Sequence, residues 1–251
     1  MKAVMNKETV EVSIKEQLAQ LISKYNASQQ SLADSVRALN QKFKEDVLAN
    51  TYTPEHLREV YEENKAALLA AREKKAKALN ASARGAVEHL SEKAVPALSA
   101  SEKPADYAVR IGNALQFIQL EGAAISDETA AQILRDFTGD MEIMQRFRSV
   151  LEKQIAPSDR QIADQYGNTT FPYTFGQIFK YEKFRDALAE LQEMADTLFI
   201  RKLSQTETEY LHGATLSVPT DGYMQLVTER NIIEQAETVE NMISELFATT
   251  E

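Results

Sequence analysis

The sequence predicts an all-α protein: a long, coiled-coil-like N-terminal antiparallel helical hairpin, followed by a compact multi-helix C-terminal body. Three observations support this fold class. Glycine and proline are scarce, with eight and six in 251 residues, while good helix formers such as Ala, Leu, Glu and Lys are abundant. Apolar residues near the N-terminus recur at alternating spacings of four and three, which is typical of a helix with one apolar seam. Helix start and stop signals then divide the remainder into shorter helices.

The predicted hairpin has a first helix at 13–49 and a second that begins at Thr53-Pro54. Thr53 is a good N-cap, and proline suits the first helical position. The seam of the first helix consists of Ile14, Leu18, Leu21, Tyr25, Leu32 and Leu39, with Ser28 and Ser35 in its two remaining places. The second helix is rich in alanine, so the two arms, each roughly 55–60 Å long, can pack closely. We expect a bare hairpin of this kind to present surface to a partner or to a second copy, because exposed apolar seams tend to be covered.

Beyond the hairpin the predicted helices are shorter. Val95-Pro96 ends the second arm, because the residue before a proline is pushed out of helical geometry. Gly122 ends a helix, while Ser126 and Asp140 begin the next two. The predicted helices are 104–121, 126–137, 140–155, one or two turns at 158–167, 177–203 and 221–248, with non-helical segments at 168–176 and 213–222. The predicted domains are a loose tail at 1–12, the hairpin at 13–95 and an acidic helical domain at 96–251.

Composition excludes several classes of function. The chain has no cysteine, which removes disulfides, thiolate nucleophiles, zinc fingers and iron–sulfur clusters. Its formal net charge of −10 argues against the whole chain being a nucleic-acid binder. The charge is uneven: residues 1–100 hold 15 Lys+Arg and 13 Asp+Glu, so the acidity belongs to residues 101–251. We find no signal-peptide core and no apolar run long enough for a membrane span, so we expect a cytoplasmic protein with no membrane association.

Glu209 and His212 are the weak candidates for a metal site. They match the Glu-x-x-His pattern of di-iron carboxylate bundles, in which positions three apart on a helix reach one metal. Such sites need a second copy of the motif, but neither His56 nor His89 follows a glutamate three residues earlier. A solvated helix end is therefore the simpler interpretation, and we expect no metal and no cofactor. Phosphate-binding glycine loops and nucleophile elbows are also missing, so we expect no catalytic residue.

A basic stripe on the second helix is a candidate contact surface. It comprises Lys65, Arg72, Lys74, Lys75, Lys77 and Arg84. Glu73 is the one acidic residue between 65 and 84, so the stripe could track phosphates or an acidic protein surface. The stripe has no aromatic residue to stack on bases, so a nucleic-acid-associated module is the alternative rather than the expected function. It could also pair with the acidic C-terminal region of a neighbouring subunit.

An aromatic cluster at 166–184 is the candidate partner-binding segment. It holds seven of the 19 aromatic residues of the chain. We expect Phe171, Tyr173 and Phe175 to alternate in an extended loop, followed by Phe179 on a helix. Two interpretations remain open: the rings fill gaps between helices, or they form a contact patch, since Tyr and Phe are enriched at interface hot spots.

The organisation of the chain resembles that of small helical accessory or virion-assembly proteins encoded by bacteriophages and prophages. The features that carry the resemblance are the acidic, cysteine-free composition and the seam from Ile14 to Leu39 leading into a helical body. It implies a non-catalytic structural or assembly role through protein–protein contacts, in the cytoplasm or in a virion. We therefore expect self-association into a homo-oligomer or a stable protein partner. The alternatives are a nucleic-acid-associated module and a helical enzyme with a carboxylate-bound metal.

Overall fold

The all-α prediction is confirmed. The computed structural model describes residues 13–50, 52–99, 103–154 and 171–248. Within these residues the chain is helical apart from one two-stranded sheet, and the first two helices pack against each other. The helices are α1 (Ile14–Ala49), α2 (Pro54–Ser99), α3 (Tyr107–Glu121), α4 (Asp127–Leu134), α5 (Met141–Gln154), α7 (Pro172–Thr197) and α8 (Tyr223–Ala248), and the strands are β1 (Ser204–Leu211) and β2 (Ala214–Thr220). No helix among the described residues is both long and apolar enough to cross a membrane.

Backbone packing divides the chain into two compact units. The first, here called the bundle unit, contains Met1–Leu90 and Ala189–Glu240. The second, here called the short-helix unit, contains Ser91–Leu188 and Asn241–Glu251. The segment 189–240 therefore packs with the hairpin, although the sequence assigned it to the C-terminal domain. The predicted tail at 1–12 and the predicted turns at 158–167 lie outside the described residues.

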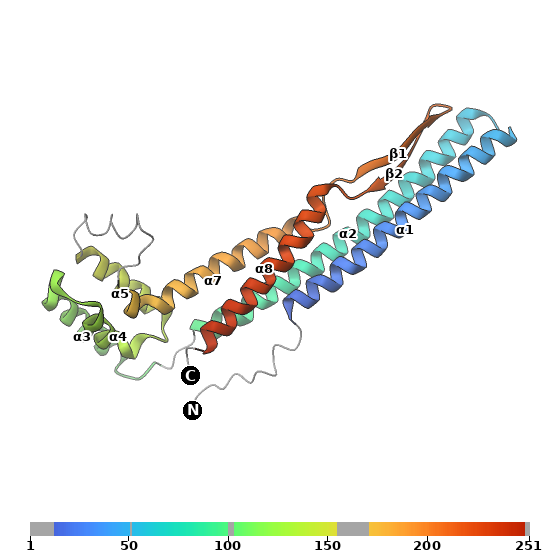
Figure 1. Ribbon diagram of the computed structural model, residues 1–251. Coiled ribbons are helices and arrows are strands. Elements are labelled where there is room, and N and C mark those ends of the chain that lie inside the picture. Colours follow the sequence, from blue (N-terminus) through green and yellow to red (C-terminus); the bar gives the residue numbers. More distant parts are fainter. Residues whose placement is uncertain (1–12, 51, 100–102, 155–170, 249–251) are drawn as a thin grey trace. The chain divides into compact units, whose positions relative to one another are not determined.

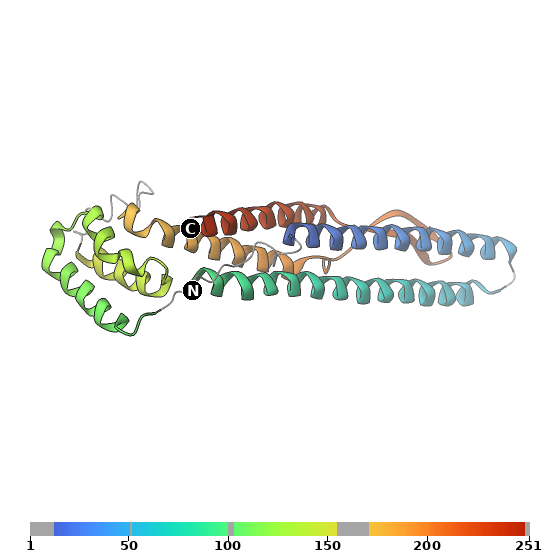
Figure 2. The same cartoon turned by 90° about the horizontal axis from the view of Figure 1, so that it is seen from below.

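The bundle unit is built on the seam of α1. Its buried residues are Ile14, Leu18, Tyr25, Leu32, Val36, Asn40 and Phe43. Helix α2 runs antiparallel to α1, and Figure 2 shows the two side by side. Its small buried residues Ala76, Ala83 and Val87 allow the close approach that the alanine content predicts. Helix α2 also continues through Val95-Pro96 to Ser99, so the predicted stop at 95 is wrong; a proline so near the end of a helix removes only one intrahelical hydrogen bond.

The hairpin of α1 and α2 is not bare. Helix α8 runs antiparallel along α1 (Figure 1), where Ser13 Oγ donates a hydrogen bond to Glu240 Oε1 at 2.6 Å and Lys15 Nζ pairs with Glu237 at 2.9 Å. Five buried residues of α8 repeat the alternating four–three spacing of α1. They are Gln225, Glu229, Ile232, Ala236 and Val239. The seam is therefore covered within one chain, at least over this length.

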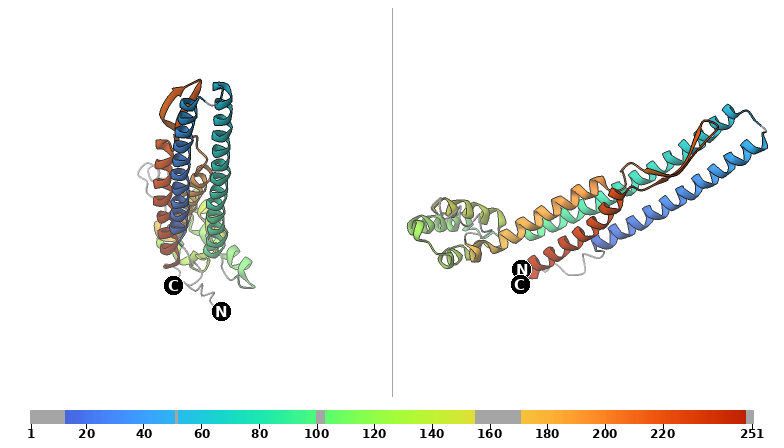
Figure 3. Two further views of the ribbon diagram at one scale, coloured as in Figure 1. Left: turned by 90° about the vertical axis from the view of Figure 1, so that its right-hand side faces the viewer. Right: turned by 45° about the horizontal axis from the view of Figure 1, so that its top comes forward.

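The antiparallel strands β1 and β2 cover the opposite end of the helical hairpin (Figure 3). The inner strand, β2, places Ala214 and Leu216 in a buried cluster with Phe43, Leu57 and Tyr61. The outer strand, β1, is almost entirely exposed. Strand β1 lies between the helix predicted at 177–203 and the segment predicted as non-helical at 213–222, and β2 occupies most of that segment. Helix α7 ends at Thr197 because Asn80 Nδ2, from α2, donates hydrogen bonds to the carbonyl oxygens of Ala195 and Leu198, both at 2.8 Å.

The short-helix unit has an aromatic and aliphatic interior. Phe137 contacts the rings of Tyr107 and Phe147, with ring centroids 5.5 and 5.1 Å apart. Side-chain caps begin its helices, as the sequence predicts: Ser126 Oγ accepts from Thr129 N at 3.2 Å, and Asp140 Oδ1 accepts from Ile143 N at 3.1 Å. Gly122, with φ of 59°, ends α3 as predicted.

Candidate functional site

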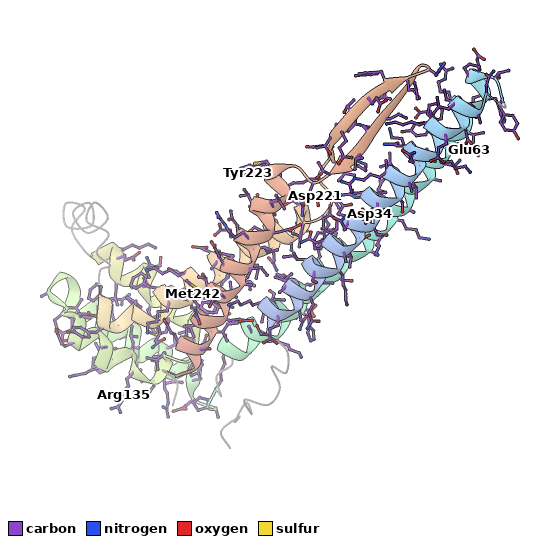
Figure 4. All side chains as sticks on the ribbon, turned by 45° about the vertical axis from the view of Figure 1, so that its right-hand side comes forward. Asp34, Glu63, Arg135, Asp221, Tyr223 and Met242 are labelled. Atoms are coloured by element: carbon purple, nitrogen blue, oxygen red, sulfur yellow. The ribbon has the colours of Figure 1, made fainter. Side chains whose placement is uncertain are left out.

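A buried polar network lies in the bundle unit, where α1, α2 and the segment before α8 meet. Tyr25 donates a hydrogen bond from its hydroxyl to Asp221 Oδ1 at 2.8 Å. Gln29 Nε2, one turn along α1, donates to the same carboxylate oxygen at 2.7 Å. Arg72 of α2 donates from Nη2 to the Tyr25 hydroxyl at 2.5 Å and from Nε to Gln29 Oε1 at 3.3 Å. Figure 4 shows Asp221 at the base of the β1–β2 hairpin, beside α1.

The network fixes the position of the Arg72 guanidinium. Its Nη2 lies 3.9 Å from Asp221, and the side chains of both residues are almost buried. The guanidinium also lies over the Tyr25 ring, 5.5 Å from the centroid, while Phe199 stacks on the same ring at 4.4 Å. Burial, together with the hydrogen bond to Asp221, raises the pKa of Tyr25 well above its usual value of 10.0. The hydroxyl is therefore a permanent donor to Asp221, and Arg72 has little freedom to move.

A groove of about 450 Å³ opens beside Arg72. Its floor is one face of α2, and its other wall comes from residues 200–205 and from β2. Five cationic side chains line it, against the single carboxylate of Glu73: Lys65, Arg72, Lys77, Arg201 and Lys202. Apolar residues, among them Leu69, Ile200 and Pro219, complete the walls. The site is thus a positively charged groove with apolar patches.

The five cations differ in how strongly they are already engaged. Lys65 Nζ donates to Thr215 O at 2.7 Å and lies over the Tyr61 ring, while Lys77 pairs with Glu73 at 2.6 Å. Arg201 is different: its Nε is buried and has no hydrogen-bond acceptor among the described residues. Lys202, next to it, is exposed. Arg201, whose buried Nε has no acceptor among the described residues, thus lines the groove beside the exposed ammonium group of Lys202.

A second polar contact lies further along α8. Gln225 Nε2 donates to Glu229 Oε1 at 2.9 Å, and Asn26 Nδ2 of α1 donates to Glu229 Oε2 at 3.3 Å. Burial raises the pKa of the Glu229 carboxyl, and the nearby charge of Asp221 adds to the effect. Gln225 Oε1 is buried and has no donor among the described residues. The pair joins α8 to α1 with hydrogen bonds at a position where the seam would otherwise be apolar.

The basic stripe is only partly a free surface. Lys65, Arg72 and Lys77 line the groove, and Arg84 pairs with Asp196 at 2.7 Å. The remaining two, Lys74 and Lys75, are exposed. Charge pairing between the basic stripe and the acidic half of the sequence occurs here within one chain, through Asp196 and Asp221, whereas the sequence suggested a neighbouring subunit.

The aromatic segment does not form the extended loop that the sequence predicts. Helix α7 begins at Pro172, because the carboxylate of Asp127 accepts hydrogen bonds from the backbone N–H groups of Tyr173 and Thr174 at 2.7 and 3.0 Å. Phe175 is consequently buried, and the Arg148 guanidinium covers Phe179, 4.5 Å from its ring centroid. Phe171 is partly buried and lies against Phe175. Tyr173 alone of the four candidates is largely exposed, at 78%.

Glu209 and His212 do not lie on a helix, so the helical arrangement that the weak metal interpretation required is not present. Glu209 belongs to β1 and pairs with Lys44 of α1 at 2.5 Å. His212 and Gly213 form the two-residue turn between the strands, with φ values of 45° and 79°, as a type I′ turn requires. No group of three or more candidate metal ligands occurs in the described part of the chain. The alternation of Thr206, Thr208 and Tyr210 before this turn was the signal for a β-hairpin.

A second accessible surface, on α3 in the short-helix unit, was missed by the sequence analysis. Val109, Phe117 and Leu120 are 64%, 58% and 82% exposed. At 100° per residue they lie within about 80° of one another around the helix, so they share one side of it with the exposed Asn113, and this side is here called the α3 face. The opposite face buries Ala114 and Ile118. The sequence did contain a signal for this surface. Helix α3 has apolar residues on two sides, and the interior of the unit can bury only one side of a helix at its surface.

Comparisons with known proteins give no relative from which a function can be transferred. No family model matches the chain, and neither a curated protein nor a solved structure shows significant similarity to it. Inference about its function therefore rests on the geometry of its own residues.

Proposed function

We propose that this protein is a non-catalytic structural or assembly component that acts through protein–protein contacts. The observation that carries the proposal is the α3 face. Large exposed apolar residues that share one side of a helix are characteristic of a protein-binding surface, because water around them is released on contact. The resemblance of the sequence to accessory and virion-assembly proteins of phages supports the same role, and we propose the cytoplasm or a virion as the place of action.

The surroundings of the α3 face suit a side chain from a partner. Phe117 borders a shallow groove of about 380 Å³ between α3 and the residues at 132–137. At its rim Arg110 is held by Asp106 and Asp136, at 2.9 and 3.2 Å. An apolar centre with a charged rim is the usual anatomy of a protein interface. We propose that a second copy of this chain is the partner, which gives a homo-oligomer.

The test is the molar mass in solution, measured by light scattering over a range of protein concentrations. We expect the full-length protein to exceed its monomer mass of 28.2 kDa and the double variant Phe117→Ser/Leu120→Ser to fall toward it. The matched control is Gln119→Ser, which changes an exposed residue of the same helix outside the α3 face and should leave the mass unchanged. A wild-type protein that stays monomeric at every concentration would overturn self-association. Circular dichroism must show that the variants keep their helical content.

A further inference from the structure

We propose that the positively charged groove between α2 and residues 200–205 binds an acidic peptide segment of a partner protein. The occupant we infer carries carboxylates interspersed with apolar side chains. This adds a second contact to the proposed function. It stands on residues of the bundle unit and does not depend on the α3 face, so the failure of one proposal can be distinguished from the failure of the other.

Charge is the first argument. The five cations and one carboxylate of the groove stand out in a chain whose net charge is −10. Clefts lined by one sign of charge focus the electrostatic field and attract ligands of opposite sign. Arg72 is held in place by Tyr25, Gln29 and Asp221, so the cation at the floor of the groove is positioned before any ligand arrives.

The second argument is the missing acceptor at Arg201. Buried N–H groups of charged side chains normally have a hydrogen-bond acceptor, since the group has lost its water. Arg201 Nε is buried without one among the described residues, in a groove that it lines itself. A carboxylate oxygen that reaches this N–H after a small shift of the Arg201 side chain would supply the missing acceptor, and Lys202 would add a second charge-assisted contact.

The third argument selects the kind of anion. Leu69, Ile200 and Pro219 give the groove apolar wall area, and Ile200 is half exposed. Free phosphate would leave this area wet, whereas a peptide with apolar residues between its carboxylates would cover it. The residues that line the groove include no aromatic ring on which a nucleic-acid base could stack. The acidic peptide is therefore favoured over RNA or DNA.

The experiment measures binding of a fluorescein-labelled peptide of Glu-Glu-Leu repeats to the full-length protein by fluorescence anisotropy. We compare the wild type with Arg201→Gln/Lys202→Gln. The matched control, Lys74→Gln/Lys75→Gln, removes the same charge from two exposed lysines outside the groove. Arg72 is left intact because its loss would break the interior network. Thermal unfolding followed by circular dichroism checks that both variants fold.

We expect the peptide to bind the wild type and the control alike and to bind the groove variant about tenfold more weakly or worse. A Lys-Lys-Leu peptide should not bind. Equal losses in the two variants would show unspecific attraction and overturn the proposal, as would the absence of peptide binding to the wild type. Tighter binding of a labelled oligothymidine than of the acidic peptide, lost in the groove variant, would reassign the groove to nucleic acid.

Discussion

The two units of the molecule differ in what they bury between their helices. The bundle unit buries polar side chains between its long antiparallel helices, including Asn40, Asn80, Gln225 and Glu229. The short-helix unit buries mainly aromatic and aliphatic residues, and the two polar residues buried in its described part, Asp140 and Thr174, serve helix N-termini. Two helices with a repeating apolar seam can shift by one repeat relative to each other and still bury the same apolar surface. Polar groups that pair across the seam fix the register, because only one alignment brings them together. Short helices of unequal length need no such device, because their ends already fix their positions.

The largest expected effect comes from breaking the apolar interior of the short-helix unit. Phe147 is buried against Phe137, so Phe147→Ala should leave a cavity and cost about 3–5 kcal/mol of unfolding free energy. Urea denaturation followed by circular dichroism measures the loss. The Phe147→Leu variant is the control and should lose clearly less. A Phe147→Ala protein as stable as the wild type would show that this interior is not the core we describe.

The next effect concerns a polar group of the bundle unit. Asn80→Ala removes the hydrogen bonds that Asn80 donates to the carbonyl oxygens of Ala195, Asp196 and Leu198 at the end of α7, and Ala195 O keeps only the backbone bond from Leu198 N. We expect a cost of about 2–3 kcal/mol. The matched control on the same helix is Asn64→Ala, since Asn64 is exposed and bonds only to Val60 O of its own helix. Equal stabilities of the two variants in urea denaturation would contradict the capping role.

The smallest effect should be a gain in stability. Burial raises the folded-state pKa of Glu229 above its ordinary value of 4.5, so the native protein carries an unfavourable buried charge once the pH exceeds that raised pKa. Glu229→Gln removes this charge, and its amide N–H can serve the unpaired Gln225 Oε1. The variant should therefore be more stable than the wild type at pH 7, and the difference should disappear as the pH falls below 4.5.

This prediction is checked by thermal melts of both proteins across the acidic range. Glu234→Gln, at an exposed position of α8, is the control and should not change the pH dependence in this way. A Glu229→Gln protein that is less stable at pH 7 would mean that the ionised carboxylate is needed by Asn26 and Gln225. In that case the charge-assisted hydrogen bonds of the Glu229 carboxylate would fix the register of α8 against α1.

The sequence predicts most of the fold, because helix periodicity and capping are local. Ser126, Asp140 and Gly122 all act where they were expected to act. The start of α7 was misplaced because its cap, Asp127, is distant in the chain, and Phe175 became a core residue as a result. The strands were missed because the charged residues of β1 suit an exposed helix as well as an exposed strand.

The candidate site was less predictable than the fold. Three of the six residues of the basic stripe do line the groove, but Arg201 and Lys202 were assigned to the end of a helix. Their position opposite α2 depends on the direction of the chain after α7 ends at Thr197, and no local sequence pattern predicts that direction. The network of Tyr25, Arg72 and Asp221 joins residues that are between 47 and 196 positions apart, so only the folded chain brings them together.

The irregular pairing of the two strands has a consequence for solubility. The register of β1 against β2 shifts between Thr206 and Glu209, and Glu207 takes a left-handed backbone with φ of 52°. Ion pairs of Glu207 with Arg37 and of Glu209 with Lys44 hold this bulged strand against α1. A bulged, charged outer strand is a poor template for a strand from another molecule. Chains gathered at high local concentration could thus meet through helix faces or the groove without their sheets joining into aggregates.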